Sequence, residues 1–127
     1  MRVNRLVVIV FLLLFLPTSV PAIGSWGIIN QRFKYDHLEI RECRDGSCVI
    51  SGDIFNKTKK MKDDICIKIY AYNIHNSYLW SETLFFRTIP AQGKVRFSEK
   101  VRDCRNANPY KLVFEEKEGR MCVRDRG

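Results

Sequence analysis

Hydrophobic and polar residues alternate between positions 65 and 72, and this is the clearest structural signal in the chain. Every second residue there is apolar, and the set comprises Ile65, Ile67, Ile69 and Ala71. A period of two places these residues on one face of a β-strand. Isoleucine is β-branched and suits a half-buried pleated surface. The opposite face is mixed and consists of Cys66, Lys68, Tyr70 and Tyr72.

Similar runs, separated by turn residues, flank this strand. Residues 49–55 alternate before it, and the polar segment 56–60 is typical of a hairpin connection or a longer sandwich loop. After it, Pro90 and Gly93 mark a turn, because proline pre-sets φ and glycine accepts positive φ. We expect further strands at residues 35–43, 94–101, 110–114 and 121–123, one or two strands over 78–80 and 84–86, and a charged turn at 115–119.

These elements amount to about seven short antiparallel strands, and no helical period is convincing beyond residue 22. The pattern therefore predicts an all-β fold, an immunoglobulin-like β-sandwich rather than a barrel. We expect a single domain over residues 23–127, a length sufficient for one hydrophobic core. Residues 23–34 are interpreted as a flexible lead-in or a first edge strand, and residues 124–127 as a frayed tail.

The central residues also resemble a known family. A G-x-I-x-N pattern ends at Asn56, the alternating strand ends in Ala71-Tyr72-Asn73, and an I-P-x-x-G turn leads to a strand ending in Phe97. Over about residues 48–114 this is similar to the FxLYD family of bacterial secreted immunoglobulin-like domains. Ala71 and Asn73 replace the Leu and Asp of the family tripeptide, and two extra residues separate the proline and glycine of the turn. The resemblance implies an extracytoplasmic β-sandwich without known catalytic residues.

The first 22 residues have the organisation of a secretory signal peptide. Arg2 and Arg5 precede an apolar run over residues 6–16, and Val20-Pro21-Ala22 offers small residues before a cleavage point. This run is too short for a membrane-spanning helix, which needs about 20 residues. We therefore expect export to the periplasm or the extracellular space. Membrane attachment is expected only in the alternative case, in which the segment stays uncleaved as an anchor.

All five cysteines follow the predicted signal, and cysteines of exported proteins mostly form disulfides. An Asp-Gly hairpin signal lies between Cys43 and Cys48, so these two form our first predicted pair, although the turn can form without a bridge. Cys104–Cys122 is the second predicted pair, which leaves Cys66 as a free or intermolecular thiol. The competing pair Cys66–Cys104 would leave Cys122 free.

The residue patterns of enzymes and metal sites are missing from the sequence. Cys66 and His75 have nothing that makes them neighbours, and thiol catalysis needs a thiolate activated by a nearby base. The carboxylate pairs at 63–64 and 115–116 would point to opposite faces of a strand. The sequence contains no C-x-x-C pair and no phosphate-binding glycine loop. We therefore expect no enzymatic activity, no cofactor and no metal.

The net charge of +8 is partly concentrated in a run of four lysines between positions 57 and 62. Such a run suits an anionic polymer or an acidic partner, or alternatively forms a solvated loop that protects strand edges. Nucleic acid is not an expected partner, because the basic residues are not interleaved with aromatic ones. Asn56-Lys57-Thr58 also matches the N-glycosylation pattern, which matters only in a eukaryotic source.

Tyr70 and Tyr72 are expected to form an aromatic patch if the outer face of the central strand is uncovered. In the alternative case, loops or a second sheet cover them. The candidate binding surface comprises Lys57, Lys59, Lys60, Lys68, Tyr70 and Tyr72. We predict a non-enzymatic binding or assembly module of the bacterial envelope or extracellular space, with a protein or an anionic envelope polymer as partner. The alternative function is a small, basic, disulfide-stapled secreted effector or inhibitor.

Overall fold

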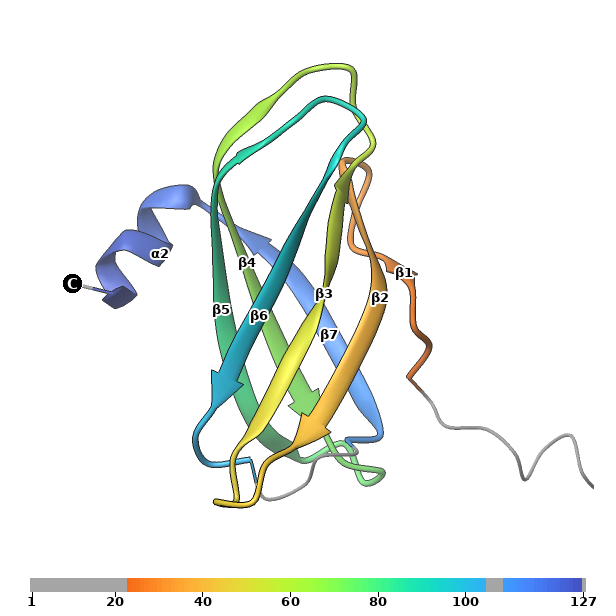
Figure 1. The fold of residues 1–127 in the computed structure, drawn as a ribbon, viewed down its shortest axis with the longest axis vertical. Coiled ribbons are helices and arrows are strands. Elements are labelled where there is room, and N and C mark those ends of the chain that lie inside the picture. The colour runs from red at the N-terminus through yellow and green to blue at the C-terminus, as the bar shows by residue number, and fades with distance from the viewer. Residues whose placement is uncertain (1–22, 105–108, 127) are drawn as a thin grey trace, which may run out of the picture.

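The computed structural model describes residues 23–104 and 109–126, which form two facing antiparallel sheets and one short helix (Figure 1). The strands are β1 (Gly27–Ile28), β2 (Phe33–Glu42), β3 (Cys48–Asn56), β4 (Lys62–Tyr72), β5 (Tyr78–Ile89), β6 (Lys94–Val101) and β7 (Lys111–Lys117), and the helix is α2 (Gly119–Arg126). The four-stranded sheet has the order β1-β2-β3-β6, and the three-stranded sheet has the order β5-β4-β7. The predicted signal peptide, residues 1–22, lies outside the described residues.

This architecture confirms the all-β sandwich with seven strands among the described residues. Its connectivity differs from that of the immunoglobulin constant domain, in which the third strand crosses to the second sheet. Here β2 and β3 form a hairpin within one sheet, with Glu42 opposite Cys48. The Asp45-Gly46 turn allows this, since Gly46 adopts φ +84°. The chain first crosses between the sheets after β3, and it crosses again after β5 and after β6.

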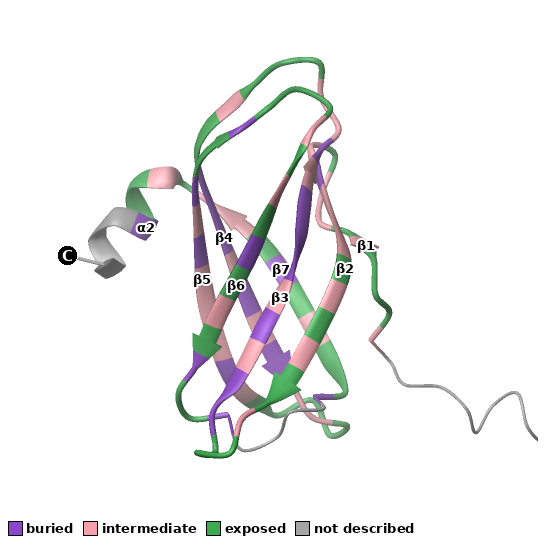
Figure 2. Ribbon diagram, viewed as in Figure 1, coloured by how far each residue is buried: buried purple, intermediate pink, exposed green. Residues whose placement is uncertain are grey.

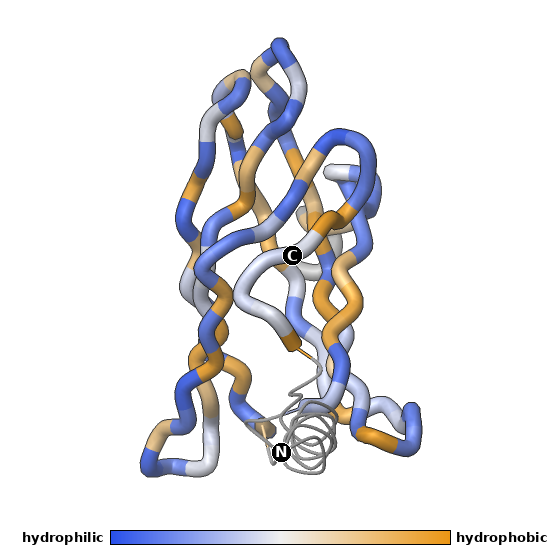
Figure 3. The backbone as a smooth tube through the Cα atoms, turned by 90° about the vertical axis from the view of Figure 1, so that its right-hand side faces the viewer, coloured by the Kyte–Doolittle hydropathy of each residue, from blue (hydrophilic) through white to orange (hydrophobic). Residues whose placement is uncertain are grey.

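The alternation predicted for the central strand is confirmed, because the inward face of β4 is closed off from solvent. Ile67, Ile69 and Ala71 are fully buried, as are Ile50 and Ile54 on the facing β3. Figure 2 shows buried positions recurring along β3, β4 and β5, and Figure 3 shows the corresponding alternation of hydrophobic and hydrophilic positions along the backbone. The core therefore lies between the two sheets, as period-two strands require.

The two aromatic segments after the central strand belong to one long strand. β5 pairs with β4 from Tyr78 opposite Tyr72 to Ile89 opposite Lys62. Glu82 and Thr83, the polar residues between the aromatic segments, are part of this ladder. The interpretation as one strand is therefore correct and the interpretation as two is not.

The C-terminal prediction is wrong in two respects. The expected charged turn at 115–119 instead continues β7 to Lys117, because Glu115 to Lys117 pair with β4. The expected last strand at 121–123 and the expected tail at 124–126 lie in α2. Gly119 permits this route, since a Cβ on it would collide with the backbone carbonyl of Asp64. The chain thus passes close over β4 where the helix begins.

Two connections between the sheets meet at the side chain of Asn56, which is fully buried. Its Nδ2 donates to the carbonyl oxygens of Lys60 at 2.8 Å and Ile89 at 3.2 Å. Its Oδ1 accepts from the Thr58 N–H at 2.9 Å and the Thr58 hydroxyl at 2.7 Å. Gln92 N–H donates to the Thr58 carbonyl at 3.0 Å. These bonds join the β3–β4 loop (57–61) to the β5–β6 turn (90–93) at the top of Figure 1, and they place the amide of the glycosylation pattern inside the fold.

Candidate binding surface

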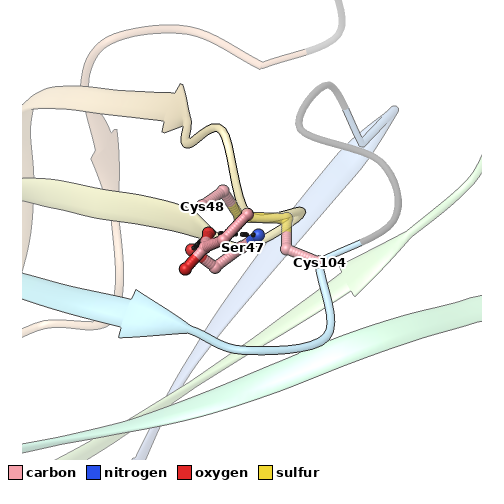
Figure 4. The surroundings of a disulfide bond; sticks show 4 residues. Ser47, Cys48 and Cys104 are labelled. Atoms are coloured by element: carbon pink, nitrogen blue, oxygen red, sulfur yellow. Dashed lines mark hydrogen bonds between the residues drawn. A yellow bond between two sulfur atoms is a disulfide. The ribbon is translucent and has the colours of Figure 1, made fainter.

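The disulfides pair differently from the prediction. Cys48 binds Cys104, with Cα atoms 5.7 Å apart (Figure 4). Cys43 is not bonded to Cys48, because the Cys43 N–H donates to the Ser47 carbonyl and therefore lies opposite Ser47 in the hairpin. Adjacent residues point to opposite faces of a strand, so Cys48 points into the core and away from Cys43. Cys43 is the free cysteine and is partly exposed.

The second disulfide joins Cys66 to Cys122, and neither the predicted Cys104–Cys122 pair nor the alternative Cys66–Cys104 pair forms. Cys66 lies on the outer face of β4, as its position in the alternation predicts, yet only 1% of its surface is exposed. The cause is α2, which contacts β4 and β5 and is tied to β4 through Cys122. The helix therefore covers one end of the outer face of the three-stranded sheet.

The other end of that face carries a cluster of tyrosines and lysines that we call the tyrosine face. Tyr70 on β4 lies opposite Ser81 on β5 and Val113 on β7. Tyr72 lies between Tyr78 of β5 and Lys111 of β7. The three strands thus bring together residues that are distant in sequence. The tyrosine face comprises Lys68, Tyr70, Tyr72, Tyr78, Lys111 and Val113.

The rings of the tyrosine face contact one another and are flanked by cations. Tyr72 and Tyr78 meet edge to face, with ring centroids 6.4 Å apart. The Lys68 ammonium lies 5.5 Å from the Tyr70 ring centroid, and the Lys111 ammonium lies 5.3 Å from that of Tyr72. Contacts of this kind are worth about 0.5–1 kcal/mol at exposed sites. They favour the observed side-chain arrangement by a small amount.

The surface remains open to solvent. Tyr78 is 60% exposed and Val113 is 37% exposed, while Lys68, Tyr70 and Tyr72 are half-buried. An apolar centre with charged residues around it is the usual anatomy of a protein interface. Tyr70 and Tyr72 each keep part of their surface exposed, so no described segment covers them completely.

Two lysines without an ion-pair partner among the described residues, Lys68 and Lys111, set the charge of this face. Lys117, at the end of β7, is paired with Glu115 at 2.7 Å. The hydrogen bond to Glu115 raises the pKa of Lys117, so the two charges cancel over the working pH range. Lys68 and Lys111 have no carboxylate partner among the residues that the structure describes, and both lie over aromatic rings. The tyrosine face is therefore positively charged.

The lysines of the β3–β4 loop do not join this surface. β4 begins beside the loop and ends at Tyr72, and eleven residues of strand span about 33 Å. Lys57, Lys59 and Lys60 therefore lie at one end of the sandwich, and Tyr72 lies at the other (Figure 1). The candidate surface predicted from the sequence is divided into two separate regions.

The outer face of the four-stranded sheet is of a different kind, because its central charge is already compensated. The Asp53 side chain is 8% exposed, and its carboxylate lies 3.0 Å from His37 Nδ1 and 3.5 Å from an Arg96 guanidinium nitrogen. Lys94 is a third cation at 3.8 Å. Burying a carboxylate is costly unless it is paired, so we interpret this cluster as structural.

Three members of the tyrosine face were absent from the sequence prediction. Tyr78 reaches the face because the β4–β5 register is irregular between Ala71 and Tyr72. Lys111 and Val113 reach it through the pairing of β7 with β4. A strand count predicts neither feature. The sequence indicates Lys111 and Val113 only indirectly, because they alternate with the inward-facing Leu112 and Phe114 of a late strand.

Comparisons with known proteins add little to this description. No family model matches the sequence, and no curated protein matches it. Among solved structures, the chain is similar to a crystal structure of a DUF1425 family member from Shewanella sp. pv-4. The sequence identity is 12%, the TM-score is 0.44, and the alignment covers 75% of this chain and 96% of that one. A similarity of this size carries no argument about function, and the resemblance to the FxLYD family is not confirmed.

Two further observations bear on the environment of the chain. Disulfides are typical of proteins that fold outside the reducing cytoplasm, and this chain has two. None of the helical residues between 23 and 126 that the structure describes forms a span long and apolar enough to cross a membrane. Within the same described residues, no three His, Cys, Asp or Glu side chains are grouped as metal ligands.

Proposed function

We propose that this chain is an exported, non-enzymatic binding module that presents the tyrosine face to a partner protein. The observation that carries the proposal is the partly exposed tyrosine face of the three-stranded sheet, which lies beyond the end that α2 covers. The signal-like N-terminus and the two disulfides support an extracytoplasmic location.

The chemistry of the face favours a partner with an acidic surface. Tyrosine is enriched in the energetically dominant centres of interfaces, and Tyr70 and Tyr72 occupy the middle strand. Lys68 and Lys111 stand beside them without carboxylate partners among the described residues. Charges at an interface rim steer association and set specificity. The partner is therefore expected to bring apolar side chains to the tyrosines and carboxylates to the lysines.

Site-specific photocrosslinking tests this proposal directly. A photoreactive amino acid replaces Ser81, which lies beside Tyr70 on the exposed face. The matched control replaces Ser98 on the outer face of the four-stranded sheet, where it pairs with Ser51. Irradiation in the natural compartment should give one protein adduct from position 81 and none from position 98. Equal adducts from both positions would contradict the proposal.

The partner identified in this way then allows the energetics to be measured. Tyr70→Ser and Tyr72→Ser should each weaken binding about 30-fold, because truncating a central interface residue costs roughly 2 kcal/mol or more. Phe55→Ser is the control, since Phe55 is also a half-buried aromatic ring under a lysine, Lys34, but lies on the other sheet. A loss below about three-fold for both tyrosine variants would remove the tyrosine face from the interface.

A further inference from the structure

The loops at the top of Figure 1 carry basic side chains and no acidic side chain of their own. Three segments meet there: residues 29–32, the β3–β4 loop at 57–61 and the β5–β6 turn at 90–93. Lys57 N–H donates to the Arg32 carbonyl at 2.8 Å, and Gln92 N–H donates to the Thr58 carbonyl at 3.0 Å, so the three segments are neighbours. Together they contain no aspartate or glutamate.

The lysines of this end are uncompensated. The ammonium groups of Lys57, Lys59 and Lys60 make no ion pair within the described residues. Arg32 is paired with Glu116. The exposed carboxylates of Asp63, Asp64 and Glu118 line the same hollow as Arg32, beside the loops and not within them. We call the loop residues Lys57, Lys59, Lys60 and Met61 the cationic tip.

An exposed apolar side chain lies among these cations. Met61 is 58% exposed, and the neighbouring turn residues Pro90 and Ala91 are exposed as well. The opposite end of the sandwich differs in charge, because its β2–β3 turn contains both a basic residue, Arg44, and an acidic one, Asp45. The tip is also pre-organised, since the buried Asn56 amide makes three hydrogen bonds to the loop, at Thr58 and Lys60, and a fourth to the Ile89 carbonyl of β5. Binding therefore costs little loop ordering.

We propose that the cationic tip docks on the surface of an anionic phospholipid membrane. The lysines would contact headgroup phosphates, and Met61 would enter the boundary with the acyl chains, the arrangement by which basic amphipathic segments bind membranes. The exposed methionine distinguishes this partner from a soluble polyanion, which offers nothing for an apolar side chain to contact. The proposal does not depend on the tyrosine face.

Vesicle sedimentation tests the proposal. Wild-type protein at about 0.1 M salt should bind vesicles containing about one third phosphatidylglycerol and should not bind vesicles of phosphatidylcholine alone. Lys59→Gln combined with Lys60→Gln should weaken binding roughly 25-fold, because each basic residue near such a surface contributes about five-fold. The matched control, Arg41→Gln with Arg44→Gln, removes the same charge from exposed positions away from the tip and should change binding less than about three-fold.

A second variant tests the apolar contact. Met61→Trp should show a blue-shifted fluorescence increment over wild type on phosphatidylglycerol vesicles, because an indole at the headgroup boundary leaves water. Equal losses for the tip and control variants would show that net charge alone acts, and would overturn the docking site. Dextran sulfate binding as tightly as the vesicles, with no fluorescence change for Met61→Trp, would identify a polyanion site and refute the lipid assignment. Absence of wild-type binding to the anionic vesicles would also refute it.

Discussion

Substituting Asn56 should destabilise the protein more than any other exchange of an asparagine in the described residues. Its side chain is fully buried and makes four hydrogen bonds, two as donor and two as acceptor. Asn56→Ala removes all four. The Ile89 carbonyl lies in a buried environment and would lose a partner, whereas the groups of Thr58 and Lys60 are partly buried and can recruit water.

The magnitude follows from these environments. A buried carbonyl left without a partner costs about 1–3 kcal/mol, and each bond that is replaced by water costs about 0.5–1.5 kcal/mol. We therefore expect Asn56→Ala to lower the free energy of unfolding by at least about 2.5 kcal/mol. For a domain of this size that corresponds to a decrease in Tm of at least roughly 10 °C. Asn56→Asp should be worse at neutral pH, because it keeps the acceptor, loses both donors and buries a charge.

Denaturant unfolding and calorimetry of three proteins measure this effect: wild type, Asn56→Ala and Asn73→Ala. Asn73 is the matched control, because its Oδ1 accepts from the backbone N–H groups of His75 and Ser77, both at 2.9 Å, in an exposed hairpin. Its substitution should cost about 1 kcal/mol. The reasoning is refuted if Asn56→Ala costs no more than Asn73→Ala.

Three further outcomes follow from the termini, the hairpin and the free thiol. Cys66→Ala combined with Cys122→Ala should raise amide exchange in residues 119–126 while β4 stays protected, because a helix of eight residues is not stable alone. The hydrogen bonds from Ser47 and Lys100 lower the pKa of Asp45, so its stabilisation is present above about pH 3.9 and is lost as pH falls through the folded-state pKa. The Tm difference between wild type and Asp45→Asn should therefore shrink below about pH 4, and a difference that grows would contradict this sign. Alkylation of the unreduced protein should modify one thiol, at Cys43, and mass spectrometry of digested protein locates it.

The strands were predictable because local alternation determines which face of each strand is buried. β4 illustrates this, since the four apolar positions read from the sequence are the ones that face the core. The turn at Asp45-Gly46 was predictable for a similar reason, as few residues accept its backbone conformation. These features depend on neighbours within a few residues, so a single sequence contains the information.

The disulfides and the helix depend on contacts that a single sequence does not specify. Cys66 was assigned to the outer face correctly, but its burial depends on α2 crossing that face. The helix lacks a strong amphipathic pattern and is held by Cys122. The sequence could have excluded one pair, Cys43–Cys48. A turn centred on Asp45 places Cys43 opposite Ser47 and not opposite Cys48.

The distance between the two proposed surfaces determines whether a membrane bound at one of them affects the charges of the other. β4 starts beside the cationic tip and runs through the tyrosine face, and its eleven residues place Lys68 about 20 Å and Tyr72 about 33 Å from the tip. The potential of an anionic membrane decays over a Debye length of about 8 Å at physiological salt. A molecule docked by its tip would therefore hold Tyr72 and Lys111 outside that potential. The lysines of the tyrosine face would then act on a protein partner alone, and both surfaces could be occupied at once without competing for charge.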